Sequence, residues 1–304
     1  MHDGIRENTK RTYRSAQNDY IKFCEEYTLN PLPASQECLM MYATQLYKRH
    51  MHINTIKVYL FAVRHYHIIN KCNNPLLCTP RLNLVLKAIQ LKCIKSKSKL
   101  PITYPILEKV YVALGRSRDE RLMWAAMTLG FFGLLRASEF TVPSQASFCN
   151  DKHLTVSDVS LRSSHSNDTF MSVRVKSSKT DSKGFILHIG CSQHTVCAVC
   201  AMTDYLNTRA MSGSDPLFLF DNDTILSRSI LVSTTRSYLA MCGIDPEKYT
   251  GHSYRVGGAT SAAEAGLSDW EIKAMGRWNS ECYHRYIKAS IIKVIGFASR
   301  MVIH

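Results

Sequence analysis

Residues 251–287 read GHSYRVGGATSAAEAGLSDWEIKAMGRWNSECYHRYI, and the rest of the chain is organised around this stretch. Its spacing predicts two helices, the first over residues 257–265 with Gly266 as its stop, and the second beginning at Ser268. Ser268 suits an N-cap because Glu271 follows three residues later, as in a capping box. The stretch therefore predicts a pair of short helices joined by a tight turn.

Four side chains of this stretch can bind or attack a phosphodiester. His252 and Arg255 lie three residues apart, so a helical turn would place them on one face. Arginine grips two phosphate oxygens with a planar fork, and the His252 ring and the Trp278 indole can donate to the same anion. The phenol of Tyr286 can act as a nucleophile, with Tyr283 in reserve. An ordinary helical pair with buried Trp278 and Tyr286 is the alternative, and any one of the four residues alone would favour it.

At these residues the chain resembles the tyrosine recombinases of the phage-integrase superfamily. GHSYRVGGAT (residues 251–260) is similar to the family's H-x-x-R box, and GRWNSECYHRYI (residues 276–287) to the box that ends in its tyrosine. Trp278 stands where many members have histidine, as in Cre-like members, and the surrounding sequence is similar to recombinases of Crypton and DIRS/Ngaro mobile elements. The resemblance implies a two-domain DNA clamp, mainly α with a small antiparallel β-sheet in the second domain.

A further motif, GLLRASE, occupies residues 133–139. The sequence predicts an apolar helix from Leu122 to Leu135 that delivers Arg136 at its end, with Glu139 one turn later. A charge at the end of so apolar a helix must reach solvent or find an anion, and pairing with Glu139 is the plainer possibility. GLLRASE is similar to the family's first arginine box, which implies that Arg136 binds the scissile phosphate and Glu139 supports the site.

Residues 153–190 change to alternating apolar and polar positions around the turn KSSKTDSKG, residues 176–184. This pattern predicts a β-hairpin or a small three-stranded sheet. The resemblance implies a lysine on this hairpin that protonates the leaving oxygen. Lys179 is the best positional match and Lys176 the second, although a lysine in a β-turn is usually only solvated.

The net charge of +14 is unevenly distributed. Residues 1–100 carry 16 Lys/Arg against 6 Asp/Glu, and residues 101–304 carry 22 against 18. Residues 41–100 contain 11 Lys/Arg and no Asp or Glu. Because a solvated surface normally mixes both signs, this stretch predicts a polyanionic partner, with nucleic acid favoured over an anionic membrane.

The domain organisation follows from the helical pattern and one linker. Four short helices are predicted to begin near Thr9, Ser35, Asn54 and Pro80, the first of them with Tyr27 on its buried face. We expect a helical core-binding domain over residues 1–94, a basic linker over 95–101, and a catalytic domain over 102–304. The linker lysines have no acidic neighbours, so we expect them to lie along DNA phosphates: Lys95, Lys97 and Lys99.

The eleven cysteines follow no regular framework, which predicts reduced thiols in an intracellular protein. CSQHTVCAVC, residues 191–200, spaces Cys191, His194, Cys197 and Cys200 like a compact zinc knuckle. The apolar residues among them instead fit the start of a helix, and so short a loop seldom directs four ligands to one centre. The sequence leaves zinc binding at these four residues open and predicts no metal at the phosphodiester site.

The resemblance implies a DNA breaking and rejoining enzyme that needs no metal and no nucleotide cofactor. Tyr286 would attack a DNA phosphate and form a 3′-phosphotyrosyl bond, while Arg136 and Arg255 neutralise the developing charge. Two alternatives remain, a type IB topoisomerase and a domesticated DNA-binding protein without turnover. With no secretory signal and no apolar run of membrane-spanning length, we expect a nuclear protein of a transposable element that acts in site-specific recombination or integration.

The C-terminal tail, residues 288–304, carries an apolar cluster too short to form its own core: Ile291, Ile292, Val294, Ile295 and Phe297. An exposed patch of this kind usually marks a partner surface. The resemblance implies that the tail docks on a neighbouring protomer, in a homodimer that pairs into a tetramer on double-stranded DNA. Docking on its own catalytic domain is the alternative.

Overall fold

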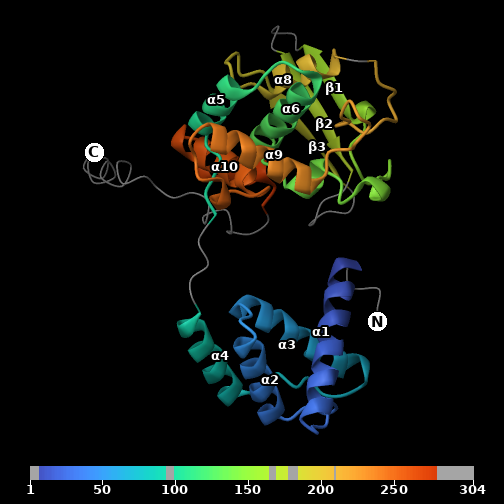
Figure 1. Ribbon diagram of the computed structural model, residues 1–304, viewed down its shortest axis with the longest axis vertical. Coiled ribbons are helices and arrows are strands. Elements are labelled where there is room, and N and C mark those ends of the chain that lie inside the picture. Colours follow the sequence, from blue (N-terminus) through green and yellow to red (C-terminus); the bar gives the residue numbers. More distant parts are fainter. Residues whose placement is uncertain (1–6, 94–98, 164–168, 177–183, 209, 279–304) are drawn as a thin grey trace, which may run out of the picture. The chain divides into compact units, whose positions relative to one another are not determined.

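The computed structural model describes residues 7–93, 99–163, 169–176, 184–208 and 210–278 (Figure 1). The chain divides into two compact units between Ser96 and Lys97, a position inside the predicted linker. The structure is mainly helical with one three-stranded antiparallel sheet, which confirms the predicted fold class. None of the described helices is both long and apolar enough to cross a membrane.

In the described part of the first unit, four helices surround a small core. They are α1 (Glu7–Glu26), α2 (Gln36–Lys48), α3 (Ile53–Ile69) and α4 (Pro80–Lys92). Tyr20, Phe23 and Tyr42 pack as an aromatic group at the centre of this core. Aromatic pairs of this kind add to the free energy that burial of their area already contributes.

Local hydrogen bonds set the helix starts in this unit. Ser35 caps α2 through the backbone N–H of Cys38, as predicted. Helix α3 begins at Ile53, next to the predicted start near Asn54, and the ring of His52 caps it by accepting from the backbone N–H of Asn54. The prediction for Tyr27 is wrong, because α1 ends one residue earlier and the Tyr27 ring is exposed.

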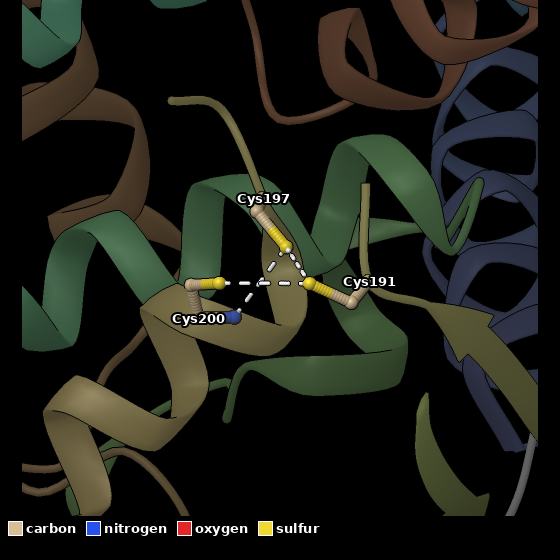
Figure 2. A group of neighbouring side chains, drawn as sticks. All are labelled: Cys191, Cys197 and Cys200. Carbon is tan, nitrogen blue, oxygen red and sulfur yellow. Dashed lines mark hydrogen bonds between the residues drawn. The ribbon is translucent and has the colours of Figure 1, made fainter. Parts of the chain in front are cut away.

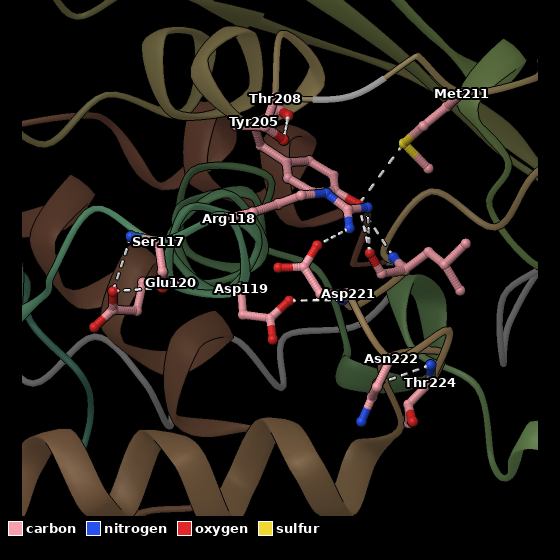
Figure 3. Close-up of polar contacts among 11 residues, drawn as sticks. Ser117, Arg118, Asp119, Glu120, Tyr205, Thr208, Met211, Asp221, Asn222 and Thr224 are labelled. Carbon is pink, nitrogen blue, oxygen red and sulfur yellow. Dashed lines mark hydrogen bonds and ion pairs between the residues drawn. The ribbon is translucent and has the colours of Figure 1, made fainter.

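The second unit surrounds α6, a helix that is buried along most of its length. Its helices are α5 (Tyr104–Ala113), α6 (Arg118–Phe132), α7 (Ala137–Phe140), α8 (Ala198–Leu206), α9 (Arg228–Met241), α10 (Ser253–Glu264) and α11 (Asp269–Gly276). Helices α8 and α10 both pack against α6. Short-range polar contacts also fasten the N-terminal end of α6, where Ser117 and Glu120 form a capping box (Figure 3).

A second set of contacts joins the first turn of α6 to a distant loop (Figure 3). The guanidinium of Arg118 pairs with Asp221 and also donates to the carbonyl of Leu219 at 2.8 Å. The hydroxyl of Tyr205, on α8, accepts from the backbone N–H of Leu219 at 3.1 Å. The start of α6, the end of α8 and this loop are therefore fixed to one another.

The sheet consists of β1 (Val159–Ser163), β2 (Thr169–Val175) and β3 (Phe185–Gly190), in that order and antiparallel. Val173 of the central strand pairs with Val159 on one side and Leu187 on the other. Met171, Val173 and Val175 face the core, as the alternating pattern requires. The prediction of a small three-stranded sheet is confirmed.

Two helix boundaries differ from the prediction at positions that matter for the site. Helix α6 ends at Phe132 rather than Leu135, because Gly133 caps it and Leu134 adopts a left-handed conformation with φ 46°. Arg136 is consequently the N-cap of α7 and not the last residue of the apolar helix. Helix α10 begins at Ser253, earlier than the predicted residue 257, so Arg255 lies in its first turn.

Candidate functional site

The candidate site is organised around residues 133–136, the sharp turn between α6 and α7. The carbonyl oxygen of Leu134 accepts hydrogen bonds from the guanidinium groups of Arg255 and Arg277. Arg277 also donates to the carbonyl of Gly133 at 3.1 Å. This turn thereby brings together the two parts of the chain that carry the predicted site residues, the GLLRASE motif and residues 251–278.

Arg136 is held in place by Glu139. Its guanidinium donates to one carboxylate oxygen of Glu139 at 2.8 Å, and its backbone N–H donates to the other at 2.9 Å. The Glu139 side chain is 1% exposed and the Arg136 side chain 23% exposed. The sequence predicted this pairing of Arg136 with Glu139 as the plainer possibility. The pairing fixes the orientation of the guanidinium and leaves part of the side chain accessible.

Arg255 is 1% exposed, and its guanidinium is surrounded by specific contacts. It donates to the backbone carbonyls of Leu134 and Gly276, and its Cζ lies 4.5 Å from the centroid of the Trp278 ring. Stacking of a guanidinium on an indole is a favourable cation–π arrangement. Gly276 leaves the space for this ring, because a Cβ there would meet Trp278 ring atoms at 1.8 Å.

His252 is the N-cap residue of α10 and lies beside this cationic group, with an exposed side chain. Neighbouring protein atoms crowd the imidazole and remove part of its hydration, which is the largest cause that lowers its pKa. The charges of Arg255, Arg136 and Arg228 lower the pKa further. The imidazole is therefore neutral at neutral pH and can accept a proton.

Comparison with known proteins agrees with this fold and these motifs. Over 93% of its length the chain is 27% identical to an integrase/recombinase XerD homologue from Selenomonas ruminantium, of which it covers 82%. The chain belongs to the tyrosine recombinase superfamily. No protein-family model matches the chain.

Solved structures share the fold of this tyrosine recombinase. A Tn1549 transposon integrase in complex with transposon right-end DNA gives a TM-score of 0.65 at 14% identity, over 99% of this chain and 96% of that one. A λ integrase dimer bound to a core site gives a TM-score of 0.58 at 15% identity, over 95% and 94%. At such low identities these likenesses concern the fold alone.

Two arginines of this recombinase site were not singled out in the sequence. The Cζ atom of Arg277 lies 4.2 Å from the centroid of the ring of Phe185, a residue of β3. Arg277 itself adopts a left-handed conformation and caps the C-terminal end of α11. Burial lowers the pKa of Arg277, and the Glu139 and Arg136 charges also act on it, in opposite directions. Arg228 is the first residue of α9, and its positive charge helps to lower the pKa of His252.

A sequence signal existed for Arg277 but not for Arg228. Arg277 lies in the GRW motif directly before Trp278, so proximity to the site could have been expected. Arg228 precedes the organising stretch by more than twenty residues in a polar helix start, and only the packing of α9 brings it near His252.

The predicted leaving-group lysine, Lys179, lies outside the described residues, whereas the second candidate is placed. Lys176 forms an ion pair with the buried Asp158 at 2.6 Å and donates to the carbonyl of His153 at 3.2 Å. Its side chain is 15% exposed. Because its ammonium group is occupied in fixing the sheet, Lys176 suits a structural role better than a proton donor.

The remaining predicted residues lie partly inside and partly outside the described ranges. Tyr286, Tyr283, Lys95 and Lys97 lie outside the described residues. Lys99 is described, and its Nζ donates to the backbone carbonyl of Glu247 at 2.7 Å, so this lysine is attached to the second unit. The structure thus brings together five of the predicted site residues: Arg136, Glu139, His252, Arg255 and Trp278.

Proposed function

We propose that this chain cleaves and rejoins DNA strands with Tyr286 as the attacking nucleophile. As a tyrosine recombinase it is a DNA breaking and rejoining enzyme. The observation that carries the assignment of residues is the convergence of Arg136, His252 and Arg255 around the turn at residues 133–136. Two cationic groups and one proton acceptor, from two segments far apart in the sequence, meet at one place and suit the negative charge of a phosphoryl-transfer transition state.

Each step of the proposed cleavage uses one side chain. The phenol oxygen of Tyr286 attacks the scissile phosphorus while the bond to the 5′-oxygen breaks, which leaves a 3′-phosphotyrosyl bond. The neutral ring of His252 accepts the phenol proton, and Lys179 donates a proton to the leaving 5′-oxygen. Attack by a 5′-hydroxyl of a second duplex reverses these transfers and rejoins the strand.

Arg136 and Arg255 stabilise the charge that develops on the phosphate oxygens. Arg136 is oriented by Glu139 and keeps an accessible face, so it can contact a phosphate oxygen directly. Arg255 is buried and stacks on Trp278. We propose that its positive charge acts on the phosphate through the electrostatic field of the site, and that its guanidinium contacts the phosphate once DNA is bound. Trp278 both stacks on Arg255 and supplies an indole N–H.

A nicked suicide duplex tests the nucleophile. When cleavage releases a short fragment, religation fails and the covalent protein–DNA adduct accumulates. Tyr286→Phe should abolish this adduct and leave duplex affinity within about twofold, because only the reacting oxygen is removed. Tyr283→Phe is the matched control and should retain the adduct. An adduct that persists in Tyr286→Phe and disappears in Tyr283→Phe would reverse the assignment.

The partner that we propose is double-stranded DNA, bound by a multimer of this chain. The λ integrase relatives of similar fold include a dimer bound to a core site and a tetramer bound to a Holliday junction. The strong positive charge of the first hundred residues supports a polyanionic partner. Strand exchange between two duplexes also needs more than one nucleophile, which a multimer supplies.

We propose that the tail, residues 288–304, joins neighbouring protomers. The second unit has an apolar cavity of about 380 Å³ between α5, α6 and α10, lined by Tyr104, Phe131, Phe132, Leu134 and Met275 among others. Leu134 also packs with Trp278, so the cavity lies close to the start of residues 279–287, the segment that carries Tyr286. Its apolar lining suits the Ile291 to Phe297 cluster of a neighbouring tail.

Truncation after Lys288 tests this assembly. The shortened chain should still bind a single site but lose cooperative assembly and strand exchange. Mixing it with a full-length chain that carries Leu134→Asp distinguishes docking in trans from docking in cis. In this mixture one chain has an intact tail and the other has an intact cavity, so recovery of cooperative assembly supports docking in trans. If the truncated protein alone assembled on DNA and exchanged strands as well as the full chain, the proposal would be wrong.

A further inference from the structure

Three cysteine side chains, none of them among the candidate recombinase residues, converge at the end of β3 and the start of α8 (Figure 2). The sulfur atoms of Cys191, Cys197 and Cys200 all lie within 4.8 Å of one another. Cys191 Sγ is 3.5 Å from Cys197 Sγ and 3.7 Å from Cys200 Sγ. His194, the fourth residue of the predicted knuckle, is exposed and does not belong to this group.

The local backbone explains why the sulfurs meet. Cys197 is the N-cap of α8, so its side chain turns back toward the helix and accepts from the backbone N–H of Cys200 at 3.5 Å. The backbone N–H of Ser192 donates to the same sulfur at 3.4 Å. The apolar residues predicted a helix start here as the alternative to a zinc knuckle. The structure has both the start of α8 and a cluster of three sulfurs.

The environment of Cys197 favours a thiolate. The residue is 1% exposed, and its sulfur accepts from the backbone N–H groups of Cys200 and Ser192. Sulfur that accepts two backbone N–H bonds in this way is a sulfur prepared to carry negative charge.

The spacing of the three sulfurs fits one tetrahedral ion. A zinc–thiolate bond of about 2.3 Å places two ligand sulfurs of a tetrahedron about 3.8 Å apart. The separations from Cys191 Sγ to the other two sulfurs, 3.5 and 3.7 Å, are close to this value. A disulfide would instead need a bond of about 2.05 Å between two of the sulfurs and would leave the third without a role.

We propose that Cys191, Cys197 and Cys200 bind one zinc ion that links the end of β3 to the first turn of α8. The three thiolates take three positions, and the fourth faces solvent on the side of Cys200, the exposed member of the group. Binding releases the thiol protons to the buffer. Because α8 packs against α6, the ion stabilises the core that carries the turn at residues 133–136.

Cobalt substitution of the full-length chain tests the site directly. The reduced protein, freed of metal by a chelator, should bind about one Co²⁺ per chain with thiolate charge-transfer absorption and the visible bands of a tetrahedral ion. Zinc should displace the cobalt and remove these bands. Cys191→Ser and Cys200→Ser should each weaken Co²⁺ binding by at least tenfold.

Matched variants separate this site from other thiols of the same unit. Cys149→Ser and Cys242→Ser change half-buried free cysteines and should keep full Co²⁺ binding. His194→Ala should also keep it, because the ring is outside the sulfur cluster. Loss of the cobalt bands in His194→Ala would overturn the three-thiolate assignment. So would a folded wild-type chain that binds no Co²⁺, or one in which anaerobic mass spectrometry finds Cys191 and Cys197 as a disulfide.

A stability measurement supplies a second readout. All three tryptophans, Trp124, Trp270 and Trp278, belong to the second unit, so their fluorescence reports the unfolding of that unit. Zinc should raise the unfolding midpoint of the wild-type chain, since a ligand that binds the folded state stabilises it. The Cys200→Ser variant should show no such rise. An equal rise in both proteins would place the zinc elsewhere and overturn the proposal.

Discussion

At the scale of single residues, the imidazole of His252 stands among three guanidinium groups. Partial loss of hydration and the charges of Arg255, Arg136 and Arg228 all disfavour its protonated form. A histidine with a lowered pKa is neutral at neutral pH and becomes charged only when the pH falls below its ordinary value of about 6.5. The site therefore holds a proton acceptor ready for the phenol without needing an adjacent carboxylate.

Nuclear magnetic resonance titration of the His252 ring checks this electrostatic argument. In the free protein the ring should titrate below about 6.5, and Arg228→Gln should raise its pKa because one nearby cation is removed. A bound duplex should raise it as well, because phosphates offset the guanidinium charges. His252→Gln identifies the resonance. A pKa that is insensitive to both changes would mean that hydration alone sets it.

Arg136 presents a choice between a structural and a catalytic role, because it pairs with a buried carboxylate. Arg136→Gln should destabilise the second unit by about 3 kcal/mol, since it leaves Glu139 charged and buried without that partner. The double variant Arg136→Gln/Glu139→Gln removes the charge and should recover most of the stability. Cleavage of the suicide duplex should fall by about 10²- to 10³-fold in both variants. Normal cleavage by the double variant would show that Arg136 is only structural.

At the scale of elements, α10 owes its position to two glycines. A Cβ at Gly257 would lie 1.7 Å from the carbonyl oxygen of Ile102, and one at Gly258 would lie 2.3 Å from that of Phe131. The helix therefore approaches the backbone before α5 and the end of α6 more closely than any other residue allows. This approach places Arg255 within reach of the Leu134 carbonyl.

Gly257→Ala measures the cost of losing this approach. Alanine gains about 1 kcal/mol of helix propensity, but backbone displacement should cost about 3 kcal/mol, so we expect a net destabilisation of about 2 kcal/mol. Urea unfolding followed by tryptophan fluorescence gives the value. Gly190→Ala is the control, because a Cβ there meets nothing within 4 Å. Equal stability of the two variants would contradict the packing argument.

The sheet is anchored by one buried carboxylate. Asp158 pairs with Lys176 at 2.6 Å and Arg174 at 2.9 Å, and it accepts from the N–H and the hydroxyl of Thr155. Burial alone would raise the pKa of Asp158, but these contacts lower it overall. They fix the end of β2 just before residues 177–183, the segment that carries Lys179.

Asp158→Asn should destabilise the second unit by about 3 kcal/mol at neutral pH, because Lys176 loses its carboxylate partner. A carboxyl with a lowered folded pKa stabilises fully above its unfolded pKa of about 3.9 and loses that contribution as the pH falls through the folded pKa. The difference between wild type and variant should therefore shrink below about pH 4. Asp151→Asn, at an exposed position, is the control. A difference that stays constant into acid would exclude the charge as its cause.

At the scale of the whole molecule, positive charge is concentrated in the first hundred residues but is partly compensated. Residues 41–100 contain no acid, yet Arg49 pairs with Asp19 at 2.9 Å and Arg81 pairs with Glu37 at 2.7 Å. Both acids come from earlier in the chain. The cations available for phosphates are therefore fewer than the sequence count, and the linker lysines gain importance.

The salt dependence of duplex binding tests the linker. Lys95→Ala/Lys97→Ala should flatten the slope of log K against log salt by roughly 0.9 for each phosphate that these lysines no longer neutralise. Adding Lys99→Ala should change the slope less, because Lys99 already bonds to the Glu247 carbonyl. Lys10→Ala removes one positive charge, from a residue paired with Glu7, and is the control for the loss of a charge outside the linker. An unchanged slope in the double variant would mean that the linker does not contact DNA.

Features that depend on neighbours along the chain were predictable from the amino-acid sequence. They include the capping box of Ser268 and Glu271, the cap at Ser35 and the start of α4 at Pro80. The alternating strands and the motifs that carry Arg136, His252, Arg255 and Trp278 were predictable as well. Helix caps, periodicity and motif spacing act over a few residues, so they can be recognised before the fold is known.

Which distant groups meet depends instead on how the folded chain packs. Packing brought Arg277 to the turn at residues 133–136, paired Lys176 with Asp158, and brought together three of the four predicted zinc-knuckle residues. The physical reason is common to these cases. Each contact joins side chains whose separation is set by the arrangement of helices and strands, and local spacing does not encode that distance.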